Sequence, residues 1–184
     1  SKAAKKEKTV VVLSAMYGIT DLLEAAISTA VEGGDFRAGL DAINQAEKEI
    51  LDAAEKAGLD CPKTGTYSKI QHQRLASRLE GIALLEQCPV DVQAEILSMG
   101  EGFSSRLMSE LLQAQGHDAL WSDTDVLPPA NDSYSDSLVD VEAAAPLLHQ
   151  ACDGVHNILV LPGFYGVNQQ GKPQLMGRNG SDYS

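Results

Sequence analysis

The sequence predicts an α/β protein in which helices cover both faces of a sheet, a three-layer αβα sandwich. Two short apolar runs, 9–13 and 158–161, are rich in Val, Ile and Leu, as in strands of parallel sheets. Between them, apolar residues recur at helical spacing over long stretches. This alternation is typical of layered α/β folds. We expect segments 9–13, 119–122 and 157–162 to share one sheet, with a helical block over 35–115 packed beside it.

The first strand is expected to lead directly into a helix. Residues 9–13 form a continuous apolar run, which predicts a strand buried on both faces. Thr20 or Asp21 is expected to open the following helix, and Gly33-Gly34 to stop it.

Three more amphipathic helices are predicted before the second strand. The first of these ends at Gly58, the next is marked by apolar residues over 75–82, and the last begins near Pro89 and stops at Gly116. Their apolar stripes predict core packing rather than a cofactor site.

The last third of the chain predicts a loop, a helix and two strands. Residues 123–140 are rich in Asp, Ser, Pro and Asn and predict a polar surface excursion. A helix is expected over 141–152. Residues 158–164 predict a buried strand that runs into a turn, and 172–176 a short return strand.

Composition excludes several classes of function. The formal net charge of −12 is unfavourable for binding nucleic acid, and the basic residues near the N-terminus are interpreted as a solvated end. No apolar stretch is long enough to span a bilayer, and no signal peptide opens the sequence. We therefore expect a single-domain cytoplasmic protein that binds neither nucleic acid nor membrane.

Cysteines and histidines give no sign of a metal or nucleophile site. The three cysteines are widely separated, so the sequence predicts neither a disulfide framework nor a Cys-x-x-Cys metal site. The four histidines lack the i, i+4 pairing of a helical zinc site. No metal ligands are predicted among these residues.

The fourth predicted helix contains an unusual triplet, Gly100-Glu101-Gly102. Each glycine costs roughly 1 kcal/mol in a helix relative to alanine, so a compensating interaction is expected. Close approach of a ligand or a neighbouring backbone to Glu101 is one explanation. Tight helix packing with a solvated Glu101 is the other.

The C-terminal octapeptide has the composition of an anion site. Arg178 can bind a carboxylate or phosphate through two hydrogen bonds, while Gly177 and Gly180 allow close backbone approach. Ser181 can cap a helix whose free amides attract anions, and Asp182 adds a carboxylate that suits a metal-bound phosphate or an ammonium group. A hairpin turn followed by an ordinary helix cap is the alternative interpretation.

Four blocks in a fixed order resemble the amino-acid kinase domain of aspartate kinases. They are residues 10–23, Met99-Gly100-Glu101, residues 162–166 and the C-terminal octapeptide. Residues 81–89 and Asn179 are more similar to the bifunctional aspartokinase/homoserine dehydrogenases than to the stand-alone lysine-sensitive enzymes. The resemblance implies an αβα sandwich of the carbamate kinase-like type and a parent protein that is a homo-oligomer.

The resemblance also implies a reaction and a set of residue roles. The reaction is transfer of a phosphoryl group from ATP, with Mg²⁺, to the side-chain carboxylate of L-aspartate, giving 4-phosphoaspartate. Arg178 would hold an aspartate carboxylate, and Glu101 would face the ammonium group. Ser14, Thr20 and Ser181 would hydrogen-bond the substrate, Asp182 would organise the reacting groups, and Gly177 and Gly180 would lie on the phosphate side.

The sequence also departs from this family pattern. The Lys-Phe-Gly-Gly segment that meets the ATP phosphates is not found before Lys8, and the nucleotide-binding half is not found after Ser184. We therefore interpret residues 1–184 as a partial amino-acid kinase domain that is inactive alone and has unpaired strand edges. Two alternatives stay open: a different amino-acid kinase, and a non-catalytic aspartate-binding regulatory fragment.

Overall fold

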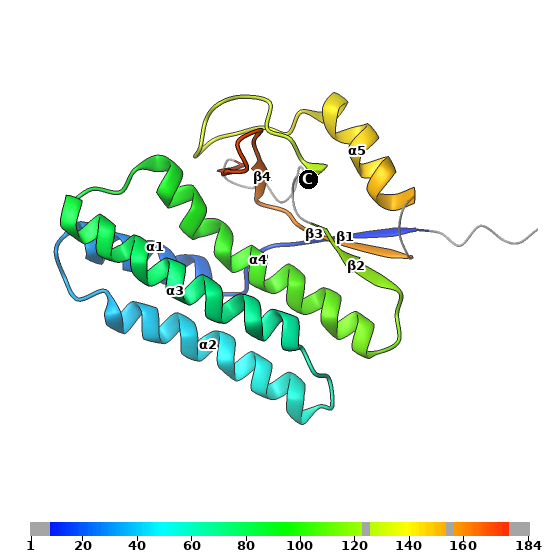
Figure 1. Ribbon diagram of the computed structural model, residues 1–184, viewed down its shortest axis with the longest axis horizontal. Coiled ribbons are helices and arrows are strands. Elements are labelled where there is room, and N and C mark those ends of the chain that lie inside the picture. Colours follow the sequence, from blue (N-terminus) through cyan, green and yellow to red (C-terminus); the bar gives the residue numbers. More distant parts are fainter. Residues whose placement is uncertain (1–7, 123–125, 154–156, 177–184) are drawn as a thin grey trace, which may run out of the picture.

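The computed structural model describes residues 8–122, 126–153 and 157–176. Figure 1 shows helices α1 to α4 on one side of a small sheet and α5 on the other. The strands are β1 (Thr9–Leu13), β2 (Ala119–Trp121), β3 (Ile158–Pro162), β4 (Tyr165–Val167) and β5 (Pro173–Leu175). The helices are α1 (Ile19–Val31), α2 (Arg37–Lys56), α3 (Pro62–Leu85), α4 (Val90–Ala114) and α5 (Val141–Asp153).

The predicted parallel sheet is confirmed. Its strand order is β1-β3-β2, and both neighbours pair with β3 in parallel, with Thr9 and Ala119 each opposite Ile158. The carboxyl ends of all three strands therefore lie at one edge, where ligand sites of open α/β sheets are found.

The expectation that residues 9–13 are buried on both faces is wrong. Thr9 and Val10 are exposed, and Val11 to Leu13 are half-buried. Among the described strands β1 pairs only with β3, so it is an edge strand. The buried strand is β3, in which Leu159, Val160 and Leu161 are all enclosed.

Three glycines end helices as predicted, and prolines stand at the start of two helices. Gly33, Gly58 and Gly116 follow α1, α2 and α4 with positive φ, a conformation that a glycine adopts without steric cost. Pro62 occupies the first turn of α3, and Pro89 directly precedes α4. Thr20 does not open α1: the helix begins one residue earlier, after Gly18, whose φ is 78°.

Two cores lie on opposite sides of the sheet. The larger lies among the long helices and includes Leu23, Leu79, Ile82 and Phe36. The smaller lies under α5, where Leu148 and Cys152 pack against Leu159 and Leu161, among others. None of the described helices has both the length and the apolar character that a membrane span requires.

The polar excursion over 123–140 is only partly at the surface. Within its described part, Val126 and Leu127 are buried in the smaller core, and Ser137 forms an isolated bridge with Met176. Apolar and backbone contacts therefore fix a stretch whose composition indicates a free loop.

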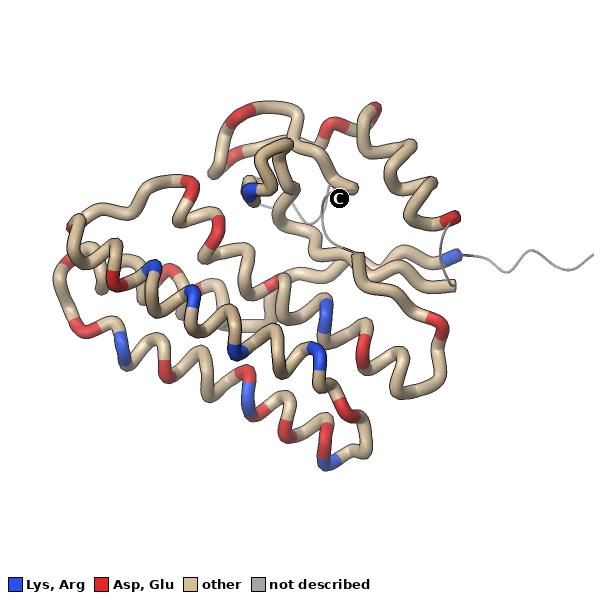
Figure 2. Tube along the Cα trace, viewed as in Figure 1, with Lys and Arg blue, Asp and Glu red and all other residues tan. Residues whose placement is uncertain are grey.

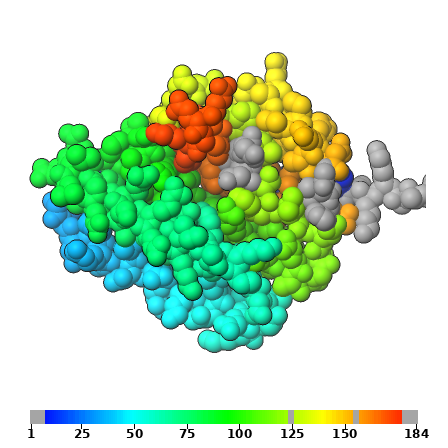
Figure 3. Space-filling model, viewed as in Figure 1, coloured from blue at the N-terminus to red at the C-terminus, as the bar shows by residue number. Residues whose placement is uncertain are grey.

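The return strand predicted at 172–176 is confirmed as β5. β5 pairs antiparallel with β4, a short strand that the sequence analysis did not predict, rather than with β3. This β4–β5 hairpin lies against α4 (Figure 3).

Candidate functional site at the carboxyl ends of the strands

Glu101 lies at the carboxyl-end edge of the sheet and is almost completely buried, with 2% of its surface exposed. Its Oε2 accepts hydrogen bonds from two backbone amides that follow β3, Gly163 N at 3.1 Å and Phe164 N at 2.6 Å. A third amide, that of Ala15 after β1, also hydrogen-bonds the carboxyl group. One side chain from α4 thus joins the loops that follow two parallel strands.

Burial changes the acidity of this carboxyl group. Desolvation raises the pKa of Glu101 to about 7, against the hydrogen bonds from Phe164, Gly163 and Ala15, which lower it. A carboxyl group poised between its two charge states in a buried site is a candidate functional residue.

Ser14 and Thr20 flank the β1–α1 turn, whose Ala15 amide hydrogen-bonds Glu101. Ser14 directly follows β1 and is exposed, and its carbonyl oxygen accepts a 2.8 Å hydrogen bond from Ser104 Oγ, one turn of α4 beyond Glu101. Thr20 is half-buried in the first turn of α1. The structure therefore brings Ser14 and Glu101, distant in sequence, to one edge of the sheet.

The glycines beside Glu101 are explained by packing. A Cβ at position 100 would lie 3.1 Å from Ala15 Cβ and 3.1 Å from Ile19 Cγ2, so Gly100 lets α4 approach the β1–α1 turn. A Cβ at position 102 would meet the hydroxyl of Tyr67 on α3 at once. Backbone amides approach Glu101 closely, and the two glycines allow tight packing of α4, so both explanations hold in part. The expectation of a solvated Glu101 is wrong, since its side chain is buried.

A second set of contacts links the backbone of α4 at Glu101 to β2. Ser105 Oγ donates to the Glu101 carbonyl oxygen at 2.6 Å and accepts from Trp121 Nε1, at the end of β2, at 3.0 Å. Arg106 lies over the ring of Trp121, with Cζ 3.4 Å from the centroid. Sequence analysis missed these residues, because only the parallel pairing of β2 brings Trp121 beside α4.

The remaining predicted site residues lie outside the described part of the chain. They are Gly177, Arg178, Gly180, Ser181 and Asp182. Among the residues that the structure does describe, no cluster of three or more His, Cys, Asp or Glu side chains is arranged to hold a metal ion.

These features define an α/β protein with a parallel sheet and a polar, partly buried site at the carboxyl ends of its strands. The amino acid kinase family matches over residues 1–184, and the chain belongs to that family. It is 28% identical to a bifunctional aspartokinase/homoserine dehydrogenase of Buchnera aphidicola, covering 97% of this chain and 22% of the relative. It is 29% identical to the lysine-sensitive aspartokinase 3 of Escherichia coli, covering 95% of this chain and 38% of the relative.

Solved structures show the same similarity. The fold matches E. coli aspartokinase III in complex with lysine and aspartate, with a TM-score of 0.68 over 95% of this chain and 38% of that one. It also matches the complex of that enzyme with aspartate and ADP, with a TM-score of 0.67. In both comparisons 29% of residues are identical. This chain therefore spans well under half the length of these relatives.

Proposed function

We propose that the chain forms part of an aspartate kinase, which transfers a phosphoryl group from ATP to the side-chain carboxylate of L-aspartate. In the whole protein this would be the first step of lysine, threonine and methionine synthesis. The observation that carries the proposal is the meeting of Ser14 and the buried Glu101 at the carboxyl ends of β1 and β3. The similar proteins named above, which are aspartokinases, support the choice of substrate.

Glu101 would receive the ammonium group of aspartate. A carboxylate offers about four acceptor positions, and the three backbone amides leave room for one more donor. A cation at this place would favour the charged form of Glu101 and lower its pKa. The KM for aspartate should therefore rise as the pH falls below about 7, the pKa of the unliganded carboxyl group.

Ser14 and Thr20 would hydrogen-bond the substrate from the start of the β1–α1 segment. Their hydroxyl groups can each donate and accept, and neither side chain is buried. Arg178 would hold a carboxylate of aspartate with its guanidinium group, and Ser181 would add a hydrogen bond.

ATP and Mg²⁺ would be met by residues of the octapeptide. The backbone amides of Gly177 and Gly180 would donate hydrogen bonds to a phosphate. The carboxylate of Asp182 would suit the magnesium ion bound to that phosphate. ATP bound there would supply the phosphoryl group. Ser14, Thr20 and Glu101 would hold and orient the acceptor, since phosphoryl transfer depends on positioning and charge stabilisation.

The test is aspartate-dependent ADP formation by the full-length protein in the presence of ATP and magnesium. Arg178→Ala should lower kcat/KM for aspartate by about 30-fold or more while leaving the KM for ATP within about twofold, because the lost charged pair is worth about 2 to 5 kcal/mol. Arg178→Lys should recover only part of the loss. Arg37→Ala, at an exposed arginine at the start of α2, is the matched control.

The result also separates the alternatives. ADP formation with glutamate or another acceptor, but not with aspartate, would indicate a different amino-acid kinase. Saturable aspartate binding without ADP formation would indicate a non-catalytic aspartate-binding protein. Either outcome overturns the proposal.

A further inference from the structure

A groove between α3, α4 and the β4–β5 hairpin concentrates positive charge on an acidic chain. Arg74, Arg78, Arg106 and Lys172 line it, and we call it the basic groove. Glu95 is the one carboxylate among its lining residues. Figure 2 shows acidic residues spread over the helices and loops elsewhere.

The concentration is large for this composition. Of the fourteen lysines and arginines, Lys2, Lys5, Lys6 and Arg178 lie outside the described residues, and four of the remaining ten line this groove. The chain as a whole carries a formal net charge of −12. A surface of this kind attracts anions, while the rest of the molecule repels them.

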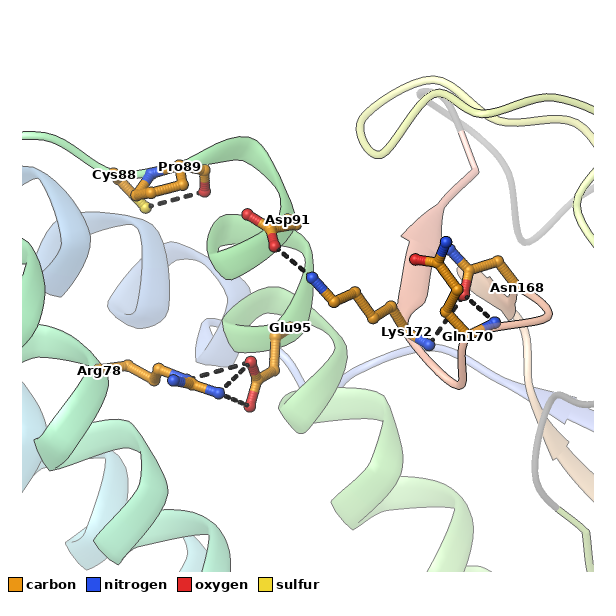
Figure 4. Close-up of polar contacts among 8 residues, drawn as sticks. All are labelled: Arg78, Cys88, Pro89, Asp91, Glu95, Asn168, Gln170 and Lys172. Atoms are coloured by element: carbon orange, nitrogen blue, oxygen red, sulfur yellow. Dashed lines mark hydrogen bonds and ion pairs between the residues drawn. The ribbon is translucent and has the colours of Figure 1, made fainter.

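The rim of the groove keeps one surplus positive charge. Arg78 pairs with Glu95 at 2.9 Å, and Arg74 shares the same carboxylate at 3.2 Å, so two guanidinium groups meet one carboxylate. Lys172 reaches from the hairpin to Asp91 at 2.7 Å and is neutralised there. Figure 4 shows Arg78 of α3 reaching Glu95 on α4, and Lys172 of the β4–β5 hairpin reaching Asp91 one turn earlier on the same helix.

Arg106 supplies a second surplus charge. Its guanidinium lies over the rings of Tyr67 and Trp121, with Cζ 4.3 Å and 3.4 Å from the two centroids. No described carboxylate forms an ion pair with it, and its buried Nε has no hydrogen-bond partner among the described residues. Stacking on aromatic rings fixes the plane of a guanidinium group, so its N–H groups are held ready for a planar anion.

The groove lies on a different side of α4 from Glu101. At 100° per residue, Glu95, Met99, Gly102 and Arg106 share one face of the helix, while Glu101 lies about a third of a turn away. The groove is therefore separate from the cluster of Glu101 and the loops after β1 and β3.

We propose that the basic groove binds a small dianion, a ligand with two phosphoryl or carboxylate groups. One group would meet the Arg106 guanidinium and the other the surplus charge of Arg74 and Arg78. The apolar parts of Met99, Val167 and Pro173 would pack against the body of the ligand. The proposal of this anion site does not depend on the proposed kinase reaction.

Calorimetric titration of the full-length protein tests the proposal, with pyrophosphate in one arm and succinate in the other. Saturating aspartate and ADP are present in both, so that the proposed substrate and nucleotide sites are filled. We expect saturable binding of at least one anion at low salt, weakened as NaCl is raised. The arm that binds more tightly identifies the acidic group.

Two variants and one control locate the binding. Arg106→Gln should weaken binding at least tenfold. Arg78→Gln, at an exposed side chain, should do likewise, because Arg74 and Glu95 then neutralise each other. Arg37→Gln removes an equal charge from an exposed residue that does not line the groove and should change the affinity less than twofold. No saturable binding of either anion, or an equal loss in Arg37→Gln, overturns the proposal.

Discussion

Two buried glutamates on the same helix make nearly the same contacts with amides from different parts of the fold. Glu110 accepts hydrogen bonds from the Lys63 and Thr64 amides at 3.1 and 2.6 Å, and Glu101 accepts from those of Gly163 and Phe164 at the same two distances. Only 9% and 2% of their surfaces are exposed. What differs is the segment that supplies the amides.

Glu110 caps a helix. The amides that it receives are free N–H groups in the first turn of α3, where Cys61 forms no side-chain cap and the helix dipole favours a negative charge. Glu101 instead receives amides from loops that follow parallel strands, where ligands bind in folds of this kind. A buried carboxylate that accepts hydrogen bonds from backbone amides therefore indicates a ligand site only when those amides lie where the fold binds ligands.

The largest expected effect separates the two glutamates by activity. Glu101→Gln should lower kcat/KM for aspartate about 100-fold in the full-length protein, because a neutral amide cannot balance the substrate ammonium, a loss of about 2 to 5 kcal/mol. Glu110→Gln should leave kcat/KM of the folded protein within about twofold. Steady-state kinetics measures kcat/KM for aspartate in both variants. Equal losses in the two variants would show that Glu101 and Glu110 do not differ in their importance for activity.

The second effect concerns pH and stability. Burial raises the pKa of Glu101 in the folded protein from its ordinary value of 4.5 to about 7. The stability that the protonated Glu101 contributes is therefore fully present below about pH 4.5 and is lost as the pH rises through 7. The loss is on the order of 3 kcal/mol. Glu101→Gln should lack this change, whereas Glu110→Gln should retain it.

Denaturant unfolding of wild type and both variants at pH 5 and pH 8 measures that difference. The unfolding free energy of wild type should fall between the two pH values by more than that of Glu101→Gln. Parallel pH profiles for wild type and Glu101→Gln would show that Glu101 does not titrate in this range.

The third effect tests the capping role. Glu110→Ala removes the acceptor from two amides, of which that of Thr64 is fully buried, and should destabilise the protein by about 2 kcal/mol. Chemical denaturation gives the value. Unchanged stability would mean that water replaces the carboxylate and that Glu110 is not a cap.

The smallest effect concerns the packing around Glu101. Gly102→Ala gains helix propensity, but its Cβ would collide with the Tyr67 hydroxyl, so we expect a net loss of about 1 kcal/mol. Gly81→Ala on α3 meets no atom within 4 Å and should stabilise by about 0.5 to 1 kcal/mol. A thermal shift of the same sign in both variants would show that Tyr67 moves without cost.

The sequence by itself determined most of the helices and strands, although not β4 or the first residue of α1. Periodic apolar residues place the helices, and Gly33, Gly58 and Gly116 end three of them, because these signals act within a few residues of the chain. The resemblance of the four blocks led to the family, and the triplet around Glu101 drew attention to the helix that carries the buried carboxylate.

Only the tertiary structure decided which residues meet. The edge position of β1, the pairing of β5 with β4, the amides that bind Glu101 and the stacking of Arg106 on Trp121 all join segments distant in sequence. Glu101 and Glu110 look alike along α4, since local pattern shows only that a carboxylate is present. Which backbone amides face it depends on how strands and helices pack, and that packing separates a candidate substrate ligand from a helix cap.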